Sequence, residues 1–203
     1  VVVSAFSGVT DQLINIGSLA AKSQNDYKKL LNELNTRHIA AVKALISAKR
    51  QDQVLANVKM LIDELENVVQ GVFLVKELSL PVLDFIMSFG ERLSAFIICE
   101  AIKDKGIKSE FVDTRTLIKT DNYFGNAKVK LKKSYANIKT YFKNRNETSV
   151  ITGFIASTEN GQTTTLGRSG SDYTASLFAV AVKADVVEIW TDVNGIMTAD
   201  PRK

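Results

Sequence analysis

Cysteine, histidine and proline are scarce in this chain of 203 residues, which has one cysteine, one histidine and two prolines. Cys99 has no second cysteine with which to form an intramolecular disulfide, so nothing indicates an oxidising compartment, and a cytoplasmic location is the default expectation. His38 lacks the second histidine, cysteine or nearby carboxylate cluster that a metal site needs, so we predict a structural role for it. The residues therefore predict no metal site.

Long apolar runs are also lacking. The longest, at 82–87 and 176–182, are far shorter than the roughly 20 residues of a transmembrane helix, so no membrane partner is predicted. The first six residues are apolar but lack the basic region of a signal peptide, and they are typical of a buried strand. Hydrophobic residues make up 45% and charged residues 24% of the chain, which argues against disordered and fibrous classes.

The net charge of +4 is modest, and much of the excess lies in lysines between Lys103 and Lys143. A nucleic-acid surface is one interpretation of these lysines. The other is a solvated helix face whose apolar positions point inward. No aromatic-rich RNA-binding signature or zinc-finger spacing accompanies the lysines, so we favour the helix face and predict no nucleic-acid partner.

The apolar pattern predicts an α/β fold. Apolar residues recur at three- and four-residue spacing from Leu30 to Ile46 and from Val54 to Val72, which predicts a helical hairpin joined near 50–52. A further helix is expected from 79–81 to Lys103, with Gly106 after it. The rest of the pattern predicts strands at 1–6, 110–112 and 149–152, a lysine-rich helix, a hairpin around 157–162, a helix at 171–183 and a strand at 185–190.

Alternating strands and helices, with strands that are apolar throughout, predict a mostly parallel central sheet with helices on both faces. Ligands in such folds bind beyond the carboxyl ends of the strands. Four segments rich in small and polar residues fall near such ends: 3–11, 88–94, 163–173 and 188–202.

The first two segments place small residues at a helix start and in the middle of a helix. In 3–11, small residues at a helix start let the backbone approach an anion, although Ser and Gly also serve as plain turn and cap residues. Gly90 lies in mid-helix, where glycine costs roughly 1 kcal/mol relative to alanine, so we suspect close approach by another backbone or a ligand. Glu91 would then face a cleft and could bind an ammonium group. Alternatively, Glu91 and Arg92 are surface residues, and Gly90 relieves crowding.

The last two segments carry charge beside glycine. Arg168 can bind a carboxylate through two parallel hydrogen bonds, and Asp172 can accept from an ammonium group or position a lysine. A helix cap at Ser171 or Asp172 is the alternative, but the two charges lie within five residues of glycine-rich chain, which favours a ligand. In 188–202, Val193 and Met197 would suit an adenine ring, although the pattern also fits an ordinary exit from a strand.

Several nucleotide-binding motifs are missing. The chain has no G-x-x-x-x-G-K-[ST] and no G-x-G-x-x-G, so neither a P-loop nor a Rossmann dinucleotide site is supported. The H-R-D and D-F-G signatures of protein kinases are absent too.

Four motifs, taken in order, resemble the aspartokinase family: Val-Ser-Ala-Phe-Ser-Gly-Val-Thr-Asp, Ser-Phe-Gly-Glu-Arg-Leu-Ser, Thr-Thr-Leu-Gly-Arg-Ser-Gly-Ser-Asp-Tyr and Trp-Thr-Asp-Val-Asn-Gly-Ile-Met-Thr-Ala-Asp-Pro-Arg. The resemblance covers essentially the whole chain and is strongest to the kinase part of bifunctional aspartokinase/homoserine dehydrogenases. It implies the amino-acid-kinase (carbamate-kinase-like) fold. It also implies transfer of a phosphoryl group from ATP, with Mg²⁺, to the side-chain carboxylate of L-aspartate, the first step towards lysine, threonine and methionine.

The resemblance also implies the roles of particular residues. Arg168 would bind the α-carboxylate of aspartate, and Glu91 and Asp172 would hold its amino group or order the charged network. The implied site comprises catalytic Ser4, Thr10 and Asp172; substrate-binding Ala5, Thr10, Glu91, Phe154, Arg168, Ser171 and Asp172; and nucleotide-binding Thr191, Asp192, Val193, Met197 and Arg202.

The family's Lys-Phe-Gly-Gly segment, whose lysine neutralises the transferring phosphate, does not occur here and is expected before Val1. A second nucleotide-binding lysine is expected after Lys203. We therefore expect residues 1–203 to be a single catalytic domain that is incomplete at both ends and inactive alone, with a homo-oligomeric full-length protein. Two alternatives stay open: a kinase for glutamate or another small acid, since Arg168 and Glu91 suit any amino acid, and a non-catalytic ligand-sensing module.

Overall fold

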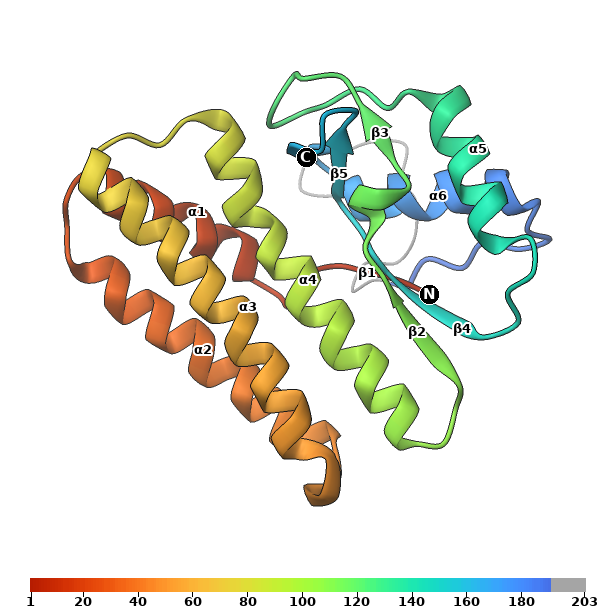
Figure 1. The fold of residues 1–203 in the computed structure, drawn as a ribbon, viewed down its shortest axis with the longest axis horizontal. Helices are drawn as coiled ribbons and strands as arrows, with labels where there is room; N and C mark the ends of the chain where they lie inside the picture. Colours follow the sequence, from red (N-terminus) through yellow and green to blue (C-terminus); the bar gives the residue numbers. More distant parts are fainter. Residues whose placement is uncertain (191–203) are drawn as a thin grey trace, which may run out of the picture.

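The computed structural model describes residues 1–190 and contains a helical part and an α/β part (Figure 1). The helices are α1 (Val9–Ala21), α2 (Asp26–Leu45), α3 (Ala48–Val75), α4 (Leu80–Asp104), α5 (Leu131–Phe142) and α6 (Gly170–Val182). The strands are β1 (Val2–Val3), β2 (Ser109–Val112), β3 (Lys119–Thr120), β4 (Thr148–Thr152), β5 (Ile155–Thr158) and β6 (Thr163–Thr165).

Helices α1 to α4 pack together, and α2 and α3 form the predicted hairpin. The joint lies at Ile46–Ser47, so the prediction of a joint near 50–52 is wrong. Ser47 ends the turn because its amide and hydroxyl both donate to the Asp104 carboxylate, at 2.8 and 2.7 Å. Arg50 lies inside α3 and pairs with Glu100 at 2.6 Å. The ends of three helices are thus tied together by polar contacts around the joint.

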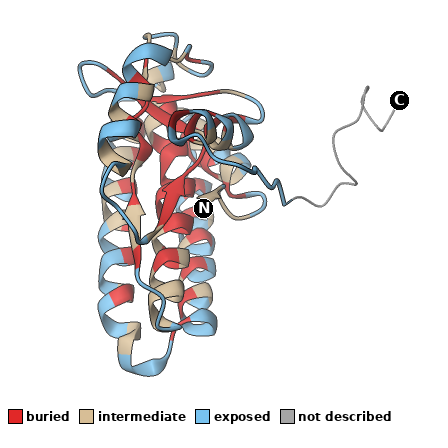
Figure 2. Ribbon diagram, turned by 90° about the vertical axis from the view of Figure 1, so that its right-hand side faces the viewer, coloured by how far each residue is buried: buried red, intermediate tan, exposed pale blue. Residues whose placement is uncertain are grey.

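Helix α4 lies between the hairpin and the sheet, as Figure 1 shows. Ser79 precedes it, Pro81 lies in its first turn, where the missing amide costs nothing, and Gly106 follows with φ +82°, as predicted. Its middle is buried on nearly every side, including the polar residues Ser88, Glu91 and Arg92. Figure 2 shows the buried residues gathered on the inward faces of the helices and in the strands between them. Buried polar side chains need hydrogen-bond partners, so the surroundings of Ser88, Glu91 and Arg92 are candidates for a functional site.

Strands β1, β4 and β2 form a parallel sheet in that order. Val150 faces α4, where Ala95 and Cys99 pack against it, whereas Ile151 faces the opposite core with Phe178 of α6. The sheet is therefore covered by helices on both faces, which confirms the predicted fold class and accounts for the neighbouring apolar residues Val150 and Ile151 of β4.

Strands β3, β5 and β6 form a second, mixed sheet in which β5 and β6 are the predicted hairpin. The chain passes from the first sheet to the second through Gly153 and Phe154. Lysine side chains of the adjoining α5 segment lie outward, where Lys130 and Lys133 pair with Glu159 and Ile138 is buried. Val129 precedes α5, and Leu131 is exposed. Val129 and Phe142 also pack against the core that contains Ile138, so the predicted inward positions are correct except for Leu131.

The predicted strand at 185–190 is wrong, because this segment has no strand pairing within residues 1–190. Its apolar side chains are exposed, and Trp190 is 90% exposed. A strand needs a hydrogen-bonded neighbour, and apolar composition alone does not supply one. Among the described residues, no helix has the length and apolar character needed to cross a membrane.

Candidate active site

Four separated segments converge on one cavity of about 330 Å³: the loop after β1, the middle of α4, Phe154 after β4 and the turn before α6. Seven of the predicted site residues line this cavity: Ser4, Ala5, Thr10, Glu91, Phe154, Ser171 and Asp172. The cavity lies at the carboxyl ends of β1 and β4, where ligands are expected in a parallel α/β fold.

Helix α4 holds the first half of the loop Ser4–Gly8. The Ser94 hydroxyl donates to the Ser4 carbonyl at 2.6 Å, and the Ala5 amide donates to Glu91 Oε1 at 3.1 Å. A Cβ added at Gly90 would lie 2.8 Å from the Ala5 Cβ, which is closer than real Cβ atoms approach. The close approach suspected at Gly90 is made by the Ala5 side chain, and it brings the loop against the helix.

Helix α2 holds the second half of the same loop. Arg37 donates to the Ser7 carbonyl at 2.8 Å, and the Phe6 ring stacks on His38 with ring centroids 5.1 Å apart. His38 is fully buried in the helical core, as predicted for a structural histidine, and burial lowers its pKa. Gly8, with φ +76°, then turns the chain into α1, whose first amides border the cavity at Thr10.

Glu91 is the most unusual group of the site. Its side chain is buried, with 2% exposure, and within residues 1–190 its Oε2 atom has no hydrogen-bond partner. Burial raises the pKa of this carboxyl to about 7, although the hydrogen bond from Ala5 opposes the shift. A cation in the cavity would favour the ionised form, so the free oxygen is suited to accept from an ammonium group.

The end of β4 and the start of α6 meet at the opposite wall. Phe154 has φ +62°, and its amide donates to the Thr174 hydroxyl at 3.1 Å. Added Cβ atoms would lie 2.5 Å from Ser171 Oγ at Gly153 and 2.7 Å from the Phe154 ring at Gly170. The two glycines therefore permit α6 to approach β4 closely enough for Ser171 and Phe154 to share one wall.

Arg168 lies on the turn between two lining residues, Gly167 and Ser169, but it does not line the cavity itself. Its side chain is exposed and makes no ion pair or hydrogen bond within residues 1–190. Its predicted role stays a prediction. The predicted nucleotide-binding residues Thr191, Asp192, Val193, Met197 and Arg202 lie outside the described residues.

The sequence analysis missed the residues that position the site, namely Asp84, Ser94, Arg37 and Thr174. Asp84 carried a usable signal, because an acid inside the apolar run Val82–Met87 of a helix indicates a buried carboxylate with partners. The other three look like ordinary surface or helix residues in the sequence. Among residues 1–190, no group of three or more His, Cys, Asp or Glu side chains is placed to hold a metal ion.

The fold and the cavity define an α/β domain with a cavity of polar and charged residues at the carboxyl ends of parallel strands. Residues 1–203 match the family model described as the amino acid kinase family, and the chain belongs to that family.

Within the family, the chain is similar to aspartokinases over its whole length. It is 33% identical to the lysine-sensitive aspartokinase 3 of Escherichia coli, of which it spans 44%, and 32% identical to a chloroplastic bifunctional aspartokinase/homoserine dehydrogenase 1 of Zea mays, of which it spans 22%. Among solved structures, E. coli aspartokinase III in complex with aspartate and ADP superimposes with a TM-score of 0.88 at 28% identity, covering 99% of this chain and 44% of that one. The predicted resemblance is confirmed.

Proposed function

We propose that this domain transfers the terminal phosphoryl group of ATP to the side-chain carboxylate of L-aspartate, giving 4-phospho-L-aspartate and ADP. The observation that carries the proposal is the convergence of seven predicted residues around one cavity, among them Glu91, whose Oε2 has no partner within residues 1–190. The 33% identity to E. coli aspartokinase 3 supports it, as does the likeness to an aspartokinase solved with aspartate and ADP.

In this proposal the two ends of the amino acid are held by opposite charges. The ammonium group donates to Glu91 Oε2, with Asp172 at the same cavity, and Arg168 binds the α-carboxylate from the turn before α6. Charge-assisted hydrogen bonds of this kind contribute about 1.5–3 kcal/mol each. With both ends fixed, the side-chain carboxylate points to Ser4, Thr10 and the first amides of α1.

Ser4, Thr10 and the first amides of α1 suit the carboxylate that receives the phosphoryl group. Phosphoryl transfer depends mainly on positioning and on stabilising charge spread over the phosphate oxygens, which amides at a helix start do without reorganisation. Ser4 and Thr10 border this point, and we assign them with Asp172 to the catalytic group. Mg²⁺ would arrive with the nucleotide and be held chiefly by its phosphates, with one or two protein carboxylates. Asp172 is the exposed carboxylate at the cavity.

A coupled assay that follows ADP release, run on the complete gene product with aspartate and with glutamate, tests the proposal. We expect turnover with aspartate and little with glutamate. Turnover with glutamate alone would favour the second candidate, which rests on the fact that Glu91 and Arg168 suit any α-amino acid.

Calorimetry with aspartate and with ADP separates the third candidate, a ligand-sensing module. Binding of either ligand without turnover by the complete gene product would support the sensor and reject the kinase. Place in a pathway, cytoplasmic location and homo-oligomeric state stay predictions. Fractionation of cells and light scattering of the complete gene product would check the last two.

A further inference from the structure

Asp84 lies in the second turn of α4 with 1% exposure, and it joins two segments that are distant in the sequence. One oxygen accepts from the amides of Gly125 and Thr165, at 2.9 and 3.0 Å. The other oxygen accepts from the Thr165 hydroxyl at 2.9 Å. Burial raises the pKa of Asp84, and these three hydrogen bonds oppose the shift. The carboxylate is thus fully partnered, unlike that of Glu91.

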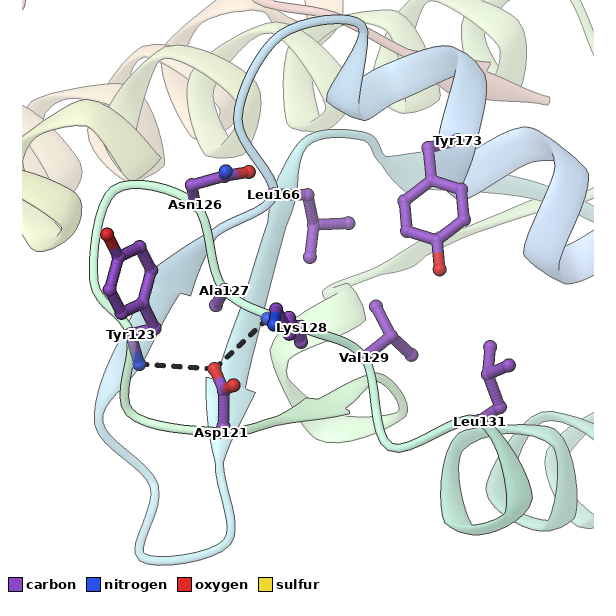
Figure 3. Close-up of a pocket in the computed structure, with 9 residues that line it drawn as sticks. All are labelled: Asp121, Tyr123, Asn126, Ala127, Lys128, Val129, Leu131, Leu166 and Tyr173. Atoms are coloured by element: carbon purple, nitrogen blue, oxygen red, sulfur yellow. Dashed lines mark hydrogen bonds between the residues drawn. The ribbon is translucent and has the colours of Figure 1, made fainter.

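The two segments bound by Asp84 also contact each other. The Ala127 amide donates to the Thr165 carbonyl at 2.9 Å. Farther along, a Cβ added at Gly167 would lie 2.5 Å from Asn126 Oδ1, so the Asn126 side chain rests directly on Gly167. In Figure 3, Asn126 lies beside the chain that leaves Leu166.

The loop that carries Gly125 and Asn126 is itself well ordered by hydrogen bonds. Asp121 Oδ1 accepts from the amides of Tyr123 and Lys128, at 3.1 and 3.0 Å, as the dashed lines in Figure 3 show. Gly125 has φ +85°, a conformation that favours glycine, and this conformation presents its amide to Asp84. The loop is therefore a firm support for Gly167.

The turn from Gly167 to Ser169 needs such support. Gly167 and Ser169 both have left-handed backbone, with φ +75° and +54°, and one hydrogen bond from Gly170 to Gly167 closes the turn. The Arg168 side chain makes no hydrogen bond or ion pair within residues 1–190 that would fix it. The direction of the guanidinium therefore depends on the backbone of the turn, and that backbone is anchored at Thr165 and at Gly167.

We propose that Asp84 is a positioning residue for Arg168: together with Asn126 it fixes the Gly167–Ser169 turn, and so sets where the guanidinium meets the carboxylate of the substrate. This inference rests on the proposed function for the role of Arg168. The structural part, that Asp84 orders the turn, is independent of any activity.

Trypsin tests the structural part, because it cleaves after Arg168 only when the turn opens. In Asp84→Asn, one acceptor oxygen is replaced by a donor amide, and we expect cleavage after Arg168 of the folded protein to be about tenfold faster. The matched control is Glu64→Gln, which removes the partner of another buried α4 side chain, Arg92, at 2.6 Å. Cleavage after Arg168 should be unchanged in that variant. Equal rates in Asp84→Asn and wild type would overturn the proposal.

Kinetics test the second part. We expect Asp84→Asn to raise KM for aspartate about tenfold with kcat within about twofold, and Asn126→Ala to change KM in the same direction by less. A merely destabilised enzyme would instead lose active molecules, which lowers apparent kcat and leaves KM. In the double variant Asp84→Asn/Arg168→Ala, KM should equal that of Arg168→Ala alone, because the group being positioned is gone.

Failure of the proposed function and failure of the proposed role of Asp84 would give different results. Absence of aspartate turnover in wild type rejects the proposed function, whereas the trypsin result still decides whether Asp84 orders the turn. Faster cleavage with an unchanged KM for aspartate overturns the positioning of Arg168. If Asp84→Asn does not fold, Thr165→Val replaces it, since that variant removes only the hydroxyl donor and leaves both backbone hydrogen bonds.

Discussion

Asp84 and Glu91 are buried carboxyl groups on the same helix, about two turns apart, and their surroundings differ completely. Asp84 receives three hydrogen bonds from protein donors. Glu91, which lines the cavity, receives one from the Ala5 amide, and its second oxygen has no partner among the described residues. The comparison teaches that burial of an acid does not by itself indicate a ligand site, whereas an unpartnered acceptor on a residue that lines a cavity favours one.

The difference also has a thermodynamic side. A buried polar group without a partner lowers stability, so the Glu91 end of α4 is less stable than residues chosen for packing would make it. The Asp84 end gains stability from its partners. Substitution of Asp84 should therefore lower stability, whereas replacement of Glu91 by a neutral residue should not.

The largest expected effect is on stability, at Asp84. Asp84→Ala leaves three donors in the protein interior without their acceptor, and we expect the free energy of unfolding to fall by about 3–5 kcal/mol. Urea denaturation followed by circular dichroism measures the loss. Glu64→Gln is the control, because Glu64 is 43% exposed and its pair with Arg92 should be worth about 1 kcal/mol or less. A loss at Asp84 no larger than at Glu64 contradicts the comparison.

The next effect is the pH dependence from Glu91. Its folded-state pKa of about 7 lies above the ordinary value of 4.5, so between these values the folded chain keeps a proton that the unfolded chain has released. The stabilising contribution is therefore fully present below pH 4.5 and is lost as the pH rises through 7, with an expected size on the order of 3 kcal/mol. Measured at pH 5 and pH 8, the unfolding free energy of wild type should fall relative to that of Glu91→Gln. A constant difference between the two proteins would show that Glu91 titrates normally.

A smaller effect is expected at Arg168. If its guanidinium binds the α-carboxylate, Arg168→Ala should reduce kcat/KM for aspartate by about ten- to a hundredfold, which is the loss of one charge-assisted contact. Arg168→Lys keeps the charge but not the two parallel hydrogen bonds. Its kcat/KM for aspartate should therefore lie between those of wild type and Arg168→Ala. Unfolding free energy should stay unchanged, because Arg168 is exposed. Unaltered kinetics would remove Arg168 from the site.

The smallest effect concerns Gly90. In Gly90→Ala, helix propensity gains about 1 kcal/mol, but the new Cβ meets Ala5 and must displace the Ser4–Gly8 loop, so stability should change little while kcat/KM for aspartate falls about tenfold. Gly71 of α3 is a matched control, since a Cβ there meets nothing within 4 Å. Gly71→Ala should stabilise the protein by about 1 kcal/mol and leave the kinetics alone. Normal kinetics in Gly90→Ala would mean that the loop tolerates the shift.

The sequence predicted most of the fold because apolar periodicity reports which face of a helix or strand is buried. The hairpin joint was misplaced because the Ser47 contact depends on Asp104, which is 57 residues away. The prediction of a strand at 185–190 was wrong because a strand needs a hydrogen-bonded neighbouring strand, which composition does not reveal.

The site was predicted in part, for a similar reason. Gly90 in mid-helix was informative by itself, since glycine there is unfavourable unless something comes close. The partners of Asp84 lie 41 and 81 residues away, so only the folded chain reveals them. The free oxygen of Glu91 is likewise visible only once the loop after β1 is in place.

Phe154 carries a further consequence. A bulky side chain at φ +62° is strained, at a cost on the order of 1–2 kcal/mol, whereas glycine would adopt the same backbone freely. Selection for stability alone would therefore place glycine after Gly153. The Phe154 ring gives the cavity an apolar wall over Gly170, so the strained backbone holds an aromatic side chain at the cavity where glycine would leave the wall open.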